Sequence, residues 1–129
     1  MKPARIWRAL PQRYRLEAAK CAACGKILYP PRAVCPECRG RVFQDHRLRD
    51  TGKIVTYTIQ HVAASQFAGQ TPFAIGIIET DDGARLMAQI VDFPLETLRT
   101  GLRVRLVFRK IQEDGESGVI AYAHKAAPD

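Results

Sequence analysis

No segment of this 129-residue sequence approaches the roughly 18 consecutive apolar residues that a membrane-spanning helix requires. The N-terminal stretch MKPARIWRALPQRYR also has no apolar core, because arginines and Pro11 interrupt its hydrophobic residues. This pattern argues against a secretory signal, and the predicted location is the cytoplasm. Catalytic patterns are missing as well. There is no glycine-rich phosphate loop, and no serine stands in a nucleophile-elbow sequence.

The composition that remains is typical of an ordinary folded domain, with 47% hydrophobic and 26% charged side chains. The three histidines, His46, His61 and His124, are far apart in the sequence and fall in or beside strand-like segments. Such histidines are more often surface or hydrogen-bonded residues than catalytic bases. An enzyme that acts alone is therefore the class of function with the least support.

Charge is distributed unevenly along the chain. Residues 1–50 contain twelve basic and four acidic side chains, a balance of +8, whereas residues 51–129 contain eight basic and nine acidic, a balance of −1. An excess of this kind predicts that the N-terminal part faces an anionic group, such as a phosphorylated ligand, a nucleic acid or an acidic protein surface. The alternative is a basic face that only promotes solubility.

The four cysteines form one cluster of two C-x-x-C pairs, with ten residues between the pairs. Two such pairs bring four thiolates together around one Zn²⁺ ion, and Gly25 suits the tight turn after the first pair. A site with four thiolates leaves no open position for substrate, which predicts a structural role. Iron suits the same ligands, and two disulfides are a further alternative. The predicted ligands are Cys21, Cys24, Cys35 and Cys38.

Beyond the cysteines, five segments have the features of short β-strands. They are rich in β-branched and aromatic residues, and several of them alternate apolar with polar side chains. Asp82-Gly83 lies between the second and third segments and is a favoured sequence for a hairpin turn. The predicted strands are Lys53–Gln60, Phe73–Glu79, Arg85–Val91, Leu102–Ile111 and Gly118–His124.

A short helix is predicted at Pro94–Arg99, between the third and fourth strands, because a proline opens it and Gly101 follows it. Three strands, a helix and two strands match the layout of an OB-fold barrel, and a small open sandwich is the alternative. The predicted fold is mainly β. It has short N-terminal helices at 1–20, a zinc ribbon at 21–50 and an OB-fold domain at 51–129.

The N-terminal segment is expected to form two short helices, the first interrupted at Pro11 and the second leading towards the first cysteine. Helices this short are marginal in water unless their apolar face is covered, either by the protein itself or by another chain. The single tryptophan with arginines near it has the composition of an interface anchor. The residues predicted for a partner interface here are Ile6, Trp7, Leu10 and Tyr14.

The sequence as a whole resembles a family of proteins that join a rubredoxin-like zinc ribbon to an OB-fold and accompany thiolases. The stretches that carry the resemblance are IWRALPQRYRL, CAACGKILYPPRAVCPECRG, GKIVTYTIQH, TPFAIGIIETDDGARLMAQIVD and GLRVRLVFRKIQEDGESGVIAYAHK. They cover nearly the whole chain in order. Arg39, in the second cysteine pair's turn, is a minor departure from the family's pattern.

This resemblance implies a non-catalytic subunit of a thiolase-superfamily complex that helps to bind acyl-CoA. The implied partner is a thiolase-like catalytic chain, as in benzoylsuccinyl-CoA thiolase, or a thiolase together with hydroxymethylglutaryl-CoA synthase. Basic side chains near the cysteines are then candidates for the CoA phosphates. These candidates are Lys26, Arg32, Arg39 and Arg41. Tyr29, Phe67 and Phe73 are candidates for the pantetheine path or the partner interface.

Binding of single-stranded nucleic acid is the alternative function, because zinc ribbons and OB-folds both recur in such proteins. An OB-fold binds single strands with aromatic platforms and a positive groove near the loops that join strands one to two and four to five. Here the first loop, 62–72, carries no charged residue, and the second, 112–117, carries three acidic residues. The loops therefore argue against a nucleic-acid groove.

Overall fold

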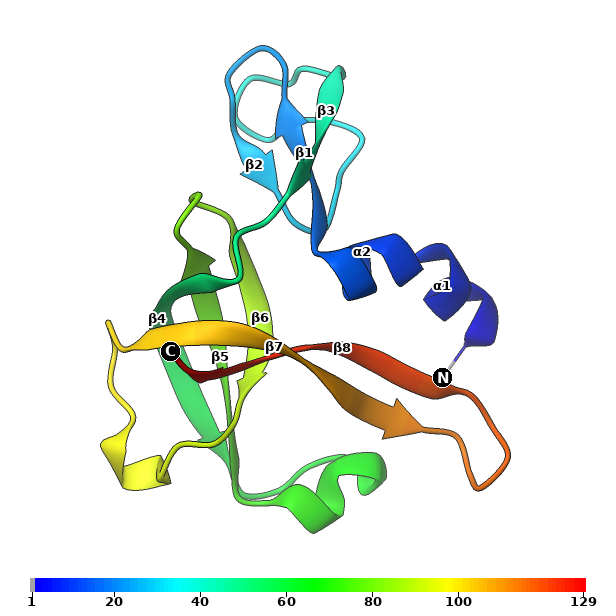
Figure 1. Cartoon of the computed structure of the whole chain (residues 1–129), viewed down its shortest axis with the longest axis vertical. Coiled ribbons are helices and arrows are strands. Elements are labelled where there is room, and N and C mark those ends of the chain that lie inside the picture. The colour runs from blue at the N-terminus through cyan, green and yellow to red at the C-terminus, as the bar shows by residue number, and fades with distance from the viewer. Residues whose placement is uncertain (1) are drawn as a thin grey trace.

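The computed structural model describes residues 2–129. Figure 1 shows a small sheet with long loops standing on a β-barrel, with two short helices beside the junction. This is the mainly β architecture that the sequence predicts. No helix within residues 2–129 is long and apolar enough to cross a membrane.

Two helices open the chain, as predicted, but the first ends at Arg8 and Pro11 lies in the first turn of the second: α1 spans Pro3–Arg8 and α2 spans Leu10–Arg15. Each carries a proline in its first turn, where a missing N–H costs no helical hydrogen bond. Leu16 ends α2 in a left-handed conformation with φ of 53° and is 4% exposed. The chain leaves the helix at this residue and enters the next strand, and the leucine side chain packs into the core.

The zinc-ribbon region contains a three-stranded antiparallel sheet with the order β2-β1-β3. Its strands are β1 Glu17–Cys21, β2 Ile27–Leu28 and β3 Phe43–Arg47. These strands were not predicted from the sequence, because they are short and lack a regular alternation of apolar residues. β1 begins within the segment assigned to the helices, four residues before the first cysteine.

The five predicted strands all form, and they close into a barrel with the order β4-β5-β6-β8-β7, in which β7 pairs back to β4. Closure rules out the open sandwich and gives the strand order of an OB-fold. Ile54, Ile78 and Val104 are at most 1% exposed and lie in the barrel core. The strands are β4 Thr51–Gln60, β5 Phe73–Thr80, β6 Arg85–Ile90, β7 Arg103–Glu113 and β8 Ile120–Pro128.

The connections differ from the prediction in two places. The helix expected at Pro94–Arg99 is only one 3₁₀ turn, η2, at Leu95–Thr97, because Leu98 is extended and turned into the core with 6% exposure. A second 3₁₀ segment, η1, at Ser65–Gln70, occupies the loop between β4 and β5 and was not predicted. The Asp82-Gly83 turn forms as expected, with Gly83 at φ of 91°.

Candidate functional site

The two cysteine pairs form equivalent turns. Gly25 donates its N–H to the Cys21 carbonyl at 2.9 Å, and Arg39 donates its N–H to the Cys35 carbonyl at the same distance. Gly25 and Arg39 also share a positive φ, 78° and 61°. The second pair is followed by an arginine where the first is followed by a glycine, but the backbone of the second turn repeats that of the first.

The four sulfur atoms lie close enough together to hold one metal ion. Cys21 Sγ is 3.4 Å from Cys38 Sγ, Cys24 Sγ is 3.5 Å from Cys35 Sγ, and all four lie within 4.8 Å of one another. Tetrahedral coordination of Zn²⁺ places thiolate sulfurs about 3.8 Å apart, whereas a disulfide needs about 2.05 Å. The cysteines are unbonded to one another, so the arrangement fits a structural zinc site and excludes the disulfide alternative.

Backbone N–H groups favour ionisation of the two buried thiols, Cys21 and Cys35. Hydrogen bonds from the N–H groups of Cys24 and Ala23 lower the pKa of the Cys21 thiol to about 6, and those from Cys38 and Glu37 lower the pKa of Cys35. Both thiols are buried, which opposes ionisation but does not outweigh these bonds. A Cβ on Gly40 would lie 3.2 Å from Cys38 Sγ, which is tighter than an ordinary van der Waals contact, so glycine suits this position beside the sulfur.

The candidates for the CoA phosphates lie on the ribbon, in different local settings. Lys26 Nζ is 2.8 Å from Glu37 Oε1, so its charge is already paired. The other three side chains have no carboxylate within 4.0 Å among residues 2–129. These are Arg32, Arg39 and Arg41, all exposed. Their contact with phosphates remains a prediction.

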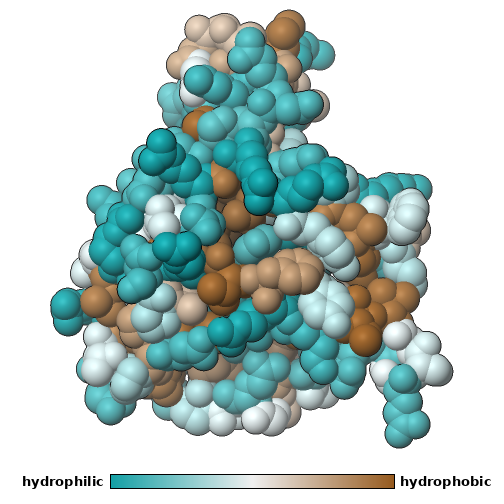
Figure 2. Space-filling model, viewed as in Figure 1, coloured by the Kyte–Doolittle hydropathy of each residue, from teal (hydrophilic) through white to brown (hydrophobic). Residues whose placement is uncertain are grey.

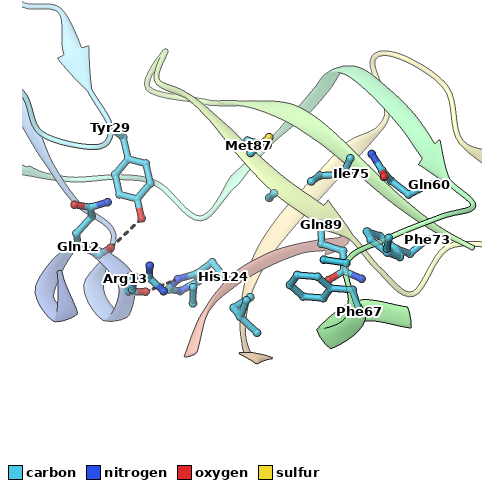
Figure 3. Close-up of a pocket in the computed structure, with 15 residues that line it drawn as sticks. Gln12, Arg13, Tyr29, Gln60, Phe67, Phe73, Ile75, Met87, Gln89 and His124 are labelled. Carbon is cyan, nitrogen blue, oxygen red and sulfur yellow. Dashed lines mark hydrogen bonds between the residues drawn. The ribbon is translucent and has the colours of Figure 1, made fainter. Parts of the chain in front are cut away.

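Three predicted interface residues meet in one groove of about 570 Å³, here termed the aromatic groove. Tyr29 borders it on the ribbon side, where its hydroxyl donates to the Gln12 carbonyl at 3.0 Å. Phe67 and Phe73 border the other side, with ring centroids 6.2 Å apart. Figure 3 shows Met87 and Ile75 between these two sides. The groove therefore runs from the ribbon and α2 across the barrel to the β4–β5 loop.

The other four predicted interface residues line a second hollow, here termed the helical patch, of about 530 Å³. Trp7 is 74% exposed, whereas Ile6 is 8% exposed and so packs against its own chain. The β7–β8 hairpin adds Val119 and Ile120, both partly exposed. The chain covers one side of α1 itself and leaves the tryptophan side open. The predicted residues in the patch are Ile6, Trp7, Leu10 and Tyr14.

Three arginines of β7 are paired with carboxylates. Arg103 makes a two-pronged ion pair with Asp81 at 2.7 and 2.9 Å, and Arg109 lies 2.8 Å from Asp92. Arg105 lies 3.5 Å from Asp50 and 3.3 Å from Asp129. The arginine's hydrogen bonds lower the pKa of Asp81 well below its usual range. This strand offers little unpaired charge to a polyanion.

A third hollow, which was not predicted from the sequence, lies at the joint between ribbon and barrel and is lined by Arg15, Arg47 and Arg49. The available signal was the alternation of Arg47 and Arg49 around Leu48, which is 4% exposed. In an extended chain this alternation places the two arginines on one side. Only the tertiary structure brings Arg15 to them from the end of α2.

Fold and metal site together define a protein with a rubredoxin-like zinc ribbon joined to an OB-fold barrel. The family profile of the ChsH2 rubredoxin-like zinc ribbon domain matches residues 8–44, and that of the ChsH2 C-terminal OB-fold domain matches residues 45–109. A DUF35 domain-containing scaffold protein of Methanocaldococcus jannaschii is 43% identical over 96% of this chain and 89% of its own length. The chain belongs to this DUF35 family of zinc-ribbon and OB-fold proteins.

More distant relatives bear names that specify assemblies. The benzoylsuccinyl-CoA thiolase subunit BbsA of Thauera aromatica is 26% identical over 85% of this chain and 74% of its own length. The solved structure of an Ltp2-ChsH2(DUF35) aldolase superposes with a TM-score of 0.74 and 24% identity, covering 99% of this chain and 96% of that one. This last likeness shows that the fold is shared.

Proposed function

We propose that this protein is a non-catalytic scaffold subunit of a thiolase-superfamily complex, which assembles with the catalytic chain and helps to bind acyl-CoA. The observation that carries the proposal is the helical patch, in which an exposed tryptophan stands among apolar side chains. Tryptophan is enriched among the residues that dominate binding energy at protein interfaces. The names of the relatives, scaffold protein and thiolase subunit, support the same assignment.

A non-catalytic role agrees with the chemistry of the described side chains. The four thiols converge on one closed site, which leaves no coordination position for a substrate. His46 Nε2 lies 2.7 Å from Asp82 Oδ2, and His124 Nδ1 lies 3.0 Å from the Arg13 carbonyl. These two histidines therefore have structural partners, as the sequence analysis expected.

The acyl-CoA part of the proposal is based on the aromatic groove and on the basic N-terminal half of the chain. The groove combines aromatic and aliphatic side chains with the amides of Gln60 and Gln89, a lining that suits a pantetheine arm or an acyl chain. The catalytic groups would come from the partner, a thiolase-like chain. Hydroxymethylglutaryl-CoA synthase would be a further member in assemblies that contain it, and the location would be the cytoplasm.

Co-purification tests the partner. The tagged full-length protein, produced in its native host, is expected to retain a thiolase-type chain that mass spectrometry identifies. Trp7→Ala is expected to weaken this association at least tenfold, because truncating an interface anchor removes a dominant contact. Val42→Ala is the control, since Val42 is 71% exposed but lies outside both the aromatic groove and the helical patch.

Both variants should keep the melting temperature of the wild type, because neither side chain contributes to the core. Retention of no thiolase-type chain would overturn the proposal, as would turnover of an acyl-CoA thioester by the isolated protein. Binding of single-stranded oligonucleotides with a steep salt dependence, and no binding of acyl-CoA, would favour the nucleic-acid alternative instead.

A further inference from the structure

A hollow of about 430 Å³ lies where α2, the β3–β4 connection and the barrel strands β7 and β8 meet. It is here termed the joint pocket. Three arginines line it, Arg15, Arg47 and Arg49, together with Tyr14, Asp50 and His124. Figure 2 shows strongly hydrophilic residues gathered where the ribbon meets the barrel. The joint pocket is the most basic of the hollows described here.

Two of the three arginines have no acidic partner. Arg15 is paired with Glu17 at 2.9 Å, and the one acidic residue in the lining, Asp50, lies 3.5 Å from Arg105. Within residues 2–129, no carboxylate lies within 4.0 Å of the guanidinium groups of Arg47 and Arg49. Two arginines without a carboxylate partner in the lining of one pocket suit a phosphate, which accepts paired hydrogen bonds from arginine.

The backbone that carries these arginines is held from both sides. Leu48 donates its N–H to the Leu16 carbonyl at 3.0 Å, and Leu106 donates its N–H to the Asp50 carbonyl at 2.6 Å. The N–H of Arg49 is bonded to Asp82 Oδ2 at 3.1 Å. These bonds hold the backbone on either side of Leu48, so the attachment points of the Arg47 and Arg49 side chains are fixed.

An aromatic surface borders the same pocket. The Tyr14 ring, which lines the joint pocket, meets Phe108 edge-on at 5.0 Å, and Phe108 stacks on Tyr122 at 5.4 Å with an interplanar angle of 16°. Tyr14 and Phe108 are 44% and 47% exposed. Aromatic faces next to arginines are a common platform for a nucleic base beside its phosphates.

We propose that the joint pocket binds the adenosine bisphosphate end of CoA, with its phosphates on Arg47 and Arg49 and its adenine against Tyr14 and Phe108. This inference rests on the proposed function, in which the protein helps to bind acyl-CoA. It assigns the phosphates to the joint rather than to the ribbon residues Arg32, Arg39 and Arg41. From the joint, the rest of CoA extends along the protein surface past His124, which lines both the joint pocket and the aromatic groove.

Calorimetric titration of the full-length, zinc-loaded protein with adenosine 3′,5′-bisphosphate, CoA and pantetheine tests this assignment. The bisphosphate and CoA are expected to bind, and pantetheine, which has no phosphate, to bind much more weakly. Arg47→Gln and Arg49→Gln are each expected to weaken binding of the bisphosphate about 10- to 100-fold, the usual effect of losing charge-assisted hydrogen bonds. Arg32→Gln and Arg41→Gln, matched changes on the ribbon, are expected to leave the affinity within about twofold.

Tyr14→Ala is expected to weaken the bisphosphate about tenfold while leaving inorganic pyrophosphate unchanged, because only the base contact is lost. Loss of affinity in the ribbon variants rather than in the joint variants would overturn the assignment, and so would a failure of the bisphosphate to bind. A single-stranded oligonucleotide that binds in place of CoA would overturn it as well. Retention of the thiolase-type partner is a separate measurement, so the proposed function can survive failure of this site.

Discussion

At the scale of single residues, local backbone chemistry explains why the metal site has its shape. Each cysteine pair ends in a residue at positive φ, glycine in the first pair and Arg39 in the second. Left-handed backbone conformation costs a residue with a side chain roughly 1–2 kcal/mol, whereas glycine adopts it freely. The second turn therefore carries an unfavourable conformational free energy that the first turn avoids.

Arg39→Gly is expected to raise the free energy of unfolding by roughly 1 kcal/mol, because it removes this cost without touching a sulfur. Urea denaturation of the zinc-loaded protein measures the change. Arg41→Gly is the matched control, since Arg41 is exposed and has no positive φ. This change should not raise the free energy of unfolding. A lower stability of Arg39→Gly would show that the arginine side chain compensates for its backbone.

Gly76 is a second position at which the backbone requires a glycine. It lies in β5 opposite Tyr57, beside the irregularity in β4 between Ile54 and Thr56. A Cβ at this position would lie 2.5 Å from the Thr56 carbonyl oxygen and 2.9 Å from Ile90 Cδ1. The barrel wall is closely packed here and has no space for a methyl group.

Gly76→Ala is therefore expected to destabilise the protein by about 1–3 kcal/mol, the usual range for overpacking. Thermal or urea unfolding measures this change in stability. Gly69→Ala serves as control, because a Cβ on Gly69 meets no atom within 4 Å. Equal stability of the two variants would mean that the β4 irregularity relaxes to make room.

At the scale of elements, the ribbon and the barrel differ in what stabilises them. The barrel closes a ring of strands around buried aliphatic residues, whereas β2 of the ribbon has only two residues. Cys21 and Cys35, at 1% and 0% exposure, are among the most buried side chains of the ribbon. The ribbon is therefore expected to depend on a metal held by its four cysteines more than on an apolar core.

Cys38→Ser is expected to release the metal and to lower the melting temperature of the ribbon, while the barrel keeps its strands. Cys38 is exposed, so the loss would reflect the missing ligand rather than a cavity. Metal content by atomic spectroscopy, together with amide protection in the two parts, measures both effects. An unchanged melting temperature after loss of the metal would contradict a structural role for the site.

At the scale of the whole molecule, one carboxylate in a barrel turn connects the two parts. Asp82 Oδ2 contacts His46 Nε2 of β3 at 2.7 Å and the Arg49 N–H at 3.1 Å, as part of the β5–β6 turn. Burial opposes ionisation of this carboxyl, but hydrogen bonds from Thr80, His46 and Arg49 outweigh it and lower its pKa below the ordinary 3.8. The ribbon and the barrel should therefore lose mutual stabilisation when Asp82 is protonated.

A depressed pKa contributes stability above the ordinary value and loses it as the pH falls through the folded value. The free energy of unfolding is accordingly expected to fall as the pH drops below about 4, by up to 1.4 kcal/mol per pH unit from this group. Asp82→Asn should be less stable at pH 7, and its free energy of unfolding should fall less steeply as the pH drops. Urea transitions between pH 3 and 7 measure this. An equal slope in the two proteins would assign the acid sensitivity to Asp81 or to the metal ligands.

Much of the fold could be read from local patterns. The cysteine spacing predicted a metal site, and the alternation in the later segments predicted five barrel strands, because both signals depend on neighbouring residues alone. The ribbon strands were missed because Phe43–Arg47 is mostly polar and only its pairing with β1 makes it a strand. The helix at Pro94–Arg99 was overestimated because Leu98 contributes more to the core than to a helix.

The sequence by itself determined the cysteine cluster of the candidate metal site, the succession of strands along the chain and the basic character of the N-terminal half, since spacing and composition carry that information. Only the tertiary structure decided which charges remain unpaired. It neutralised the arginines of β7 with carboxylates distant in sequence, and it gathered Arg15, Arg47 and Arg49 around one hollow. The reason is physical: how strongly a charged side chain attracts a ligand depends on the other charges near it in space. Those neighbours come from distant parts of the sequence, so the order of residues does not reveal them.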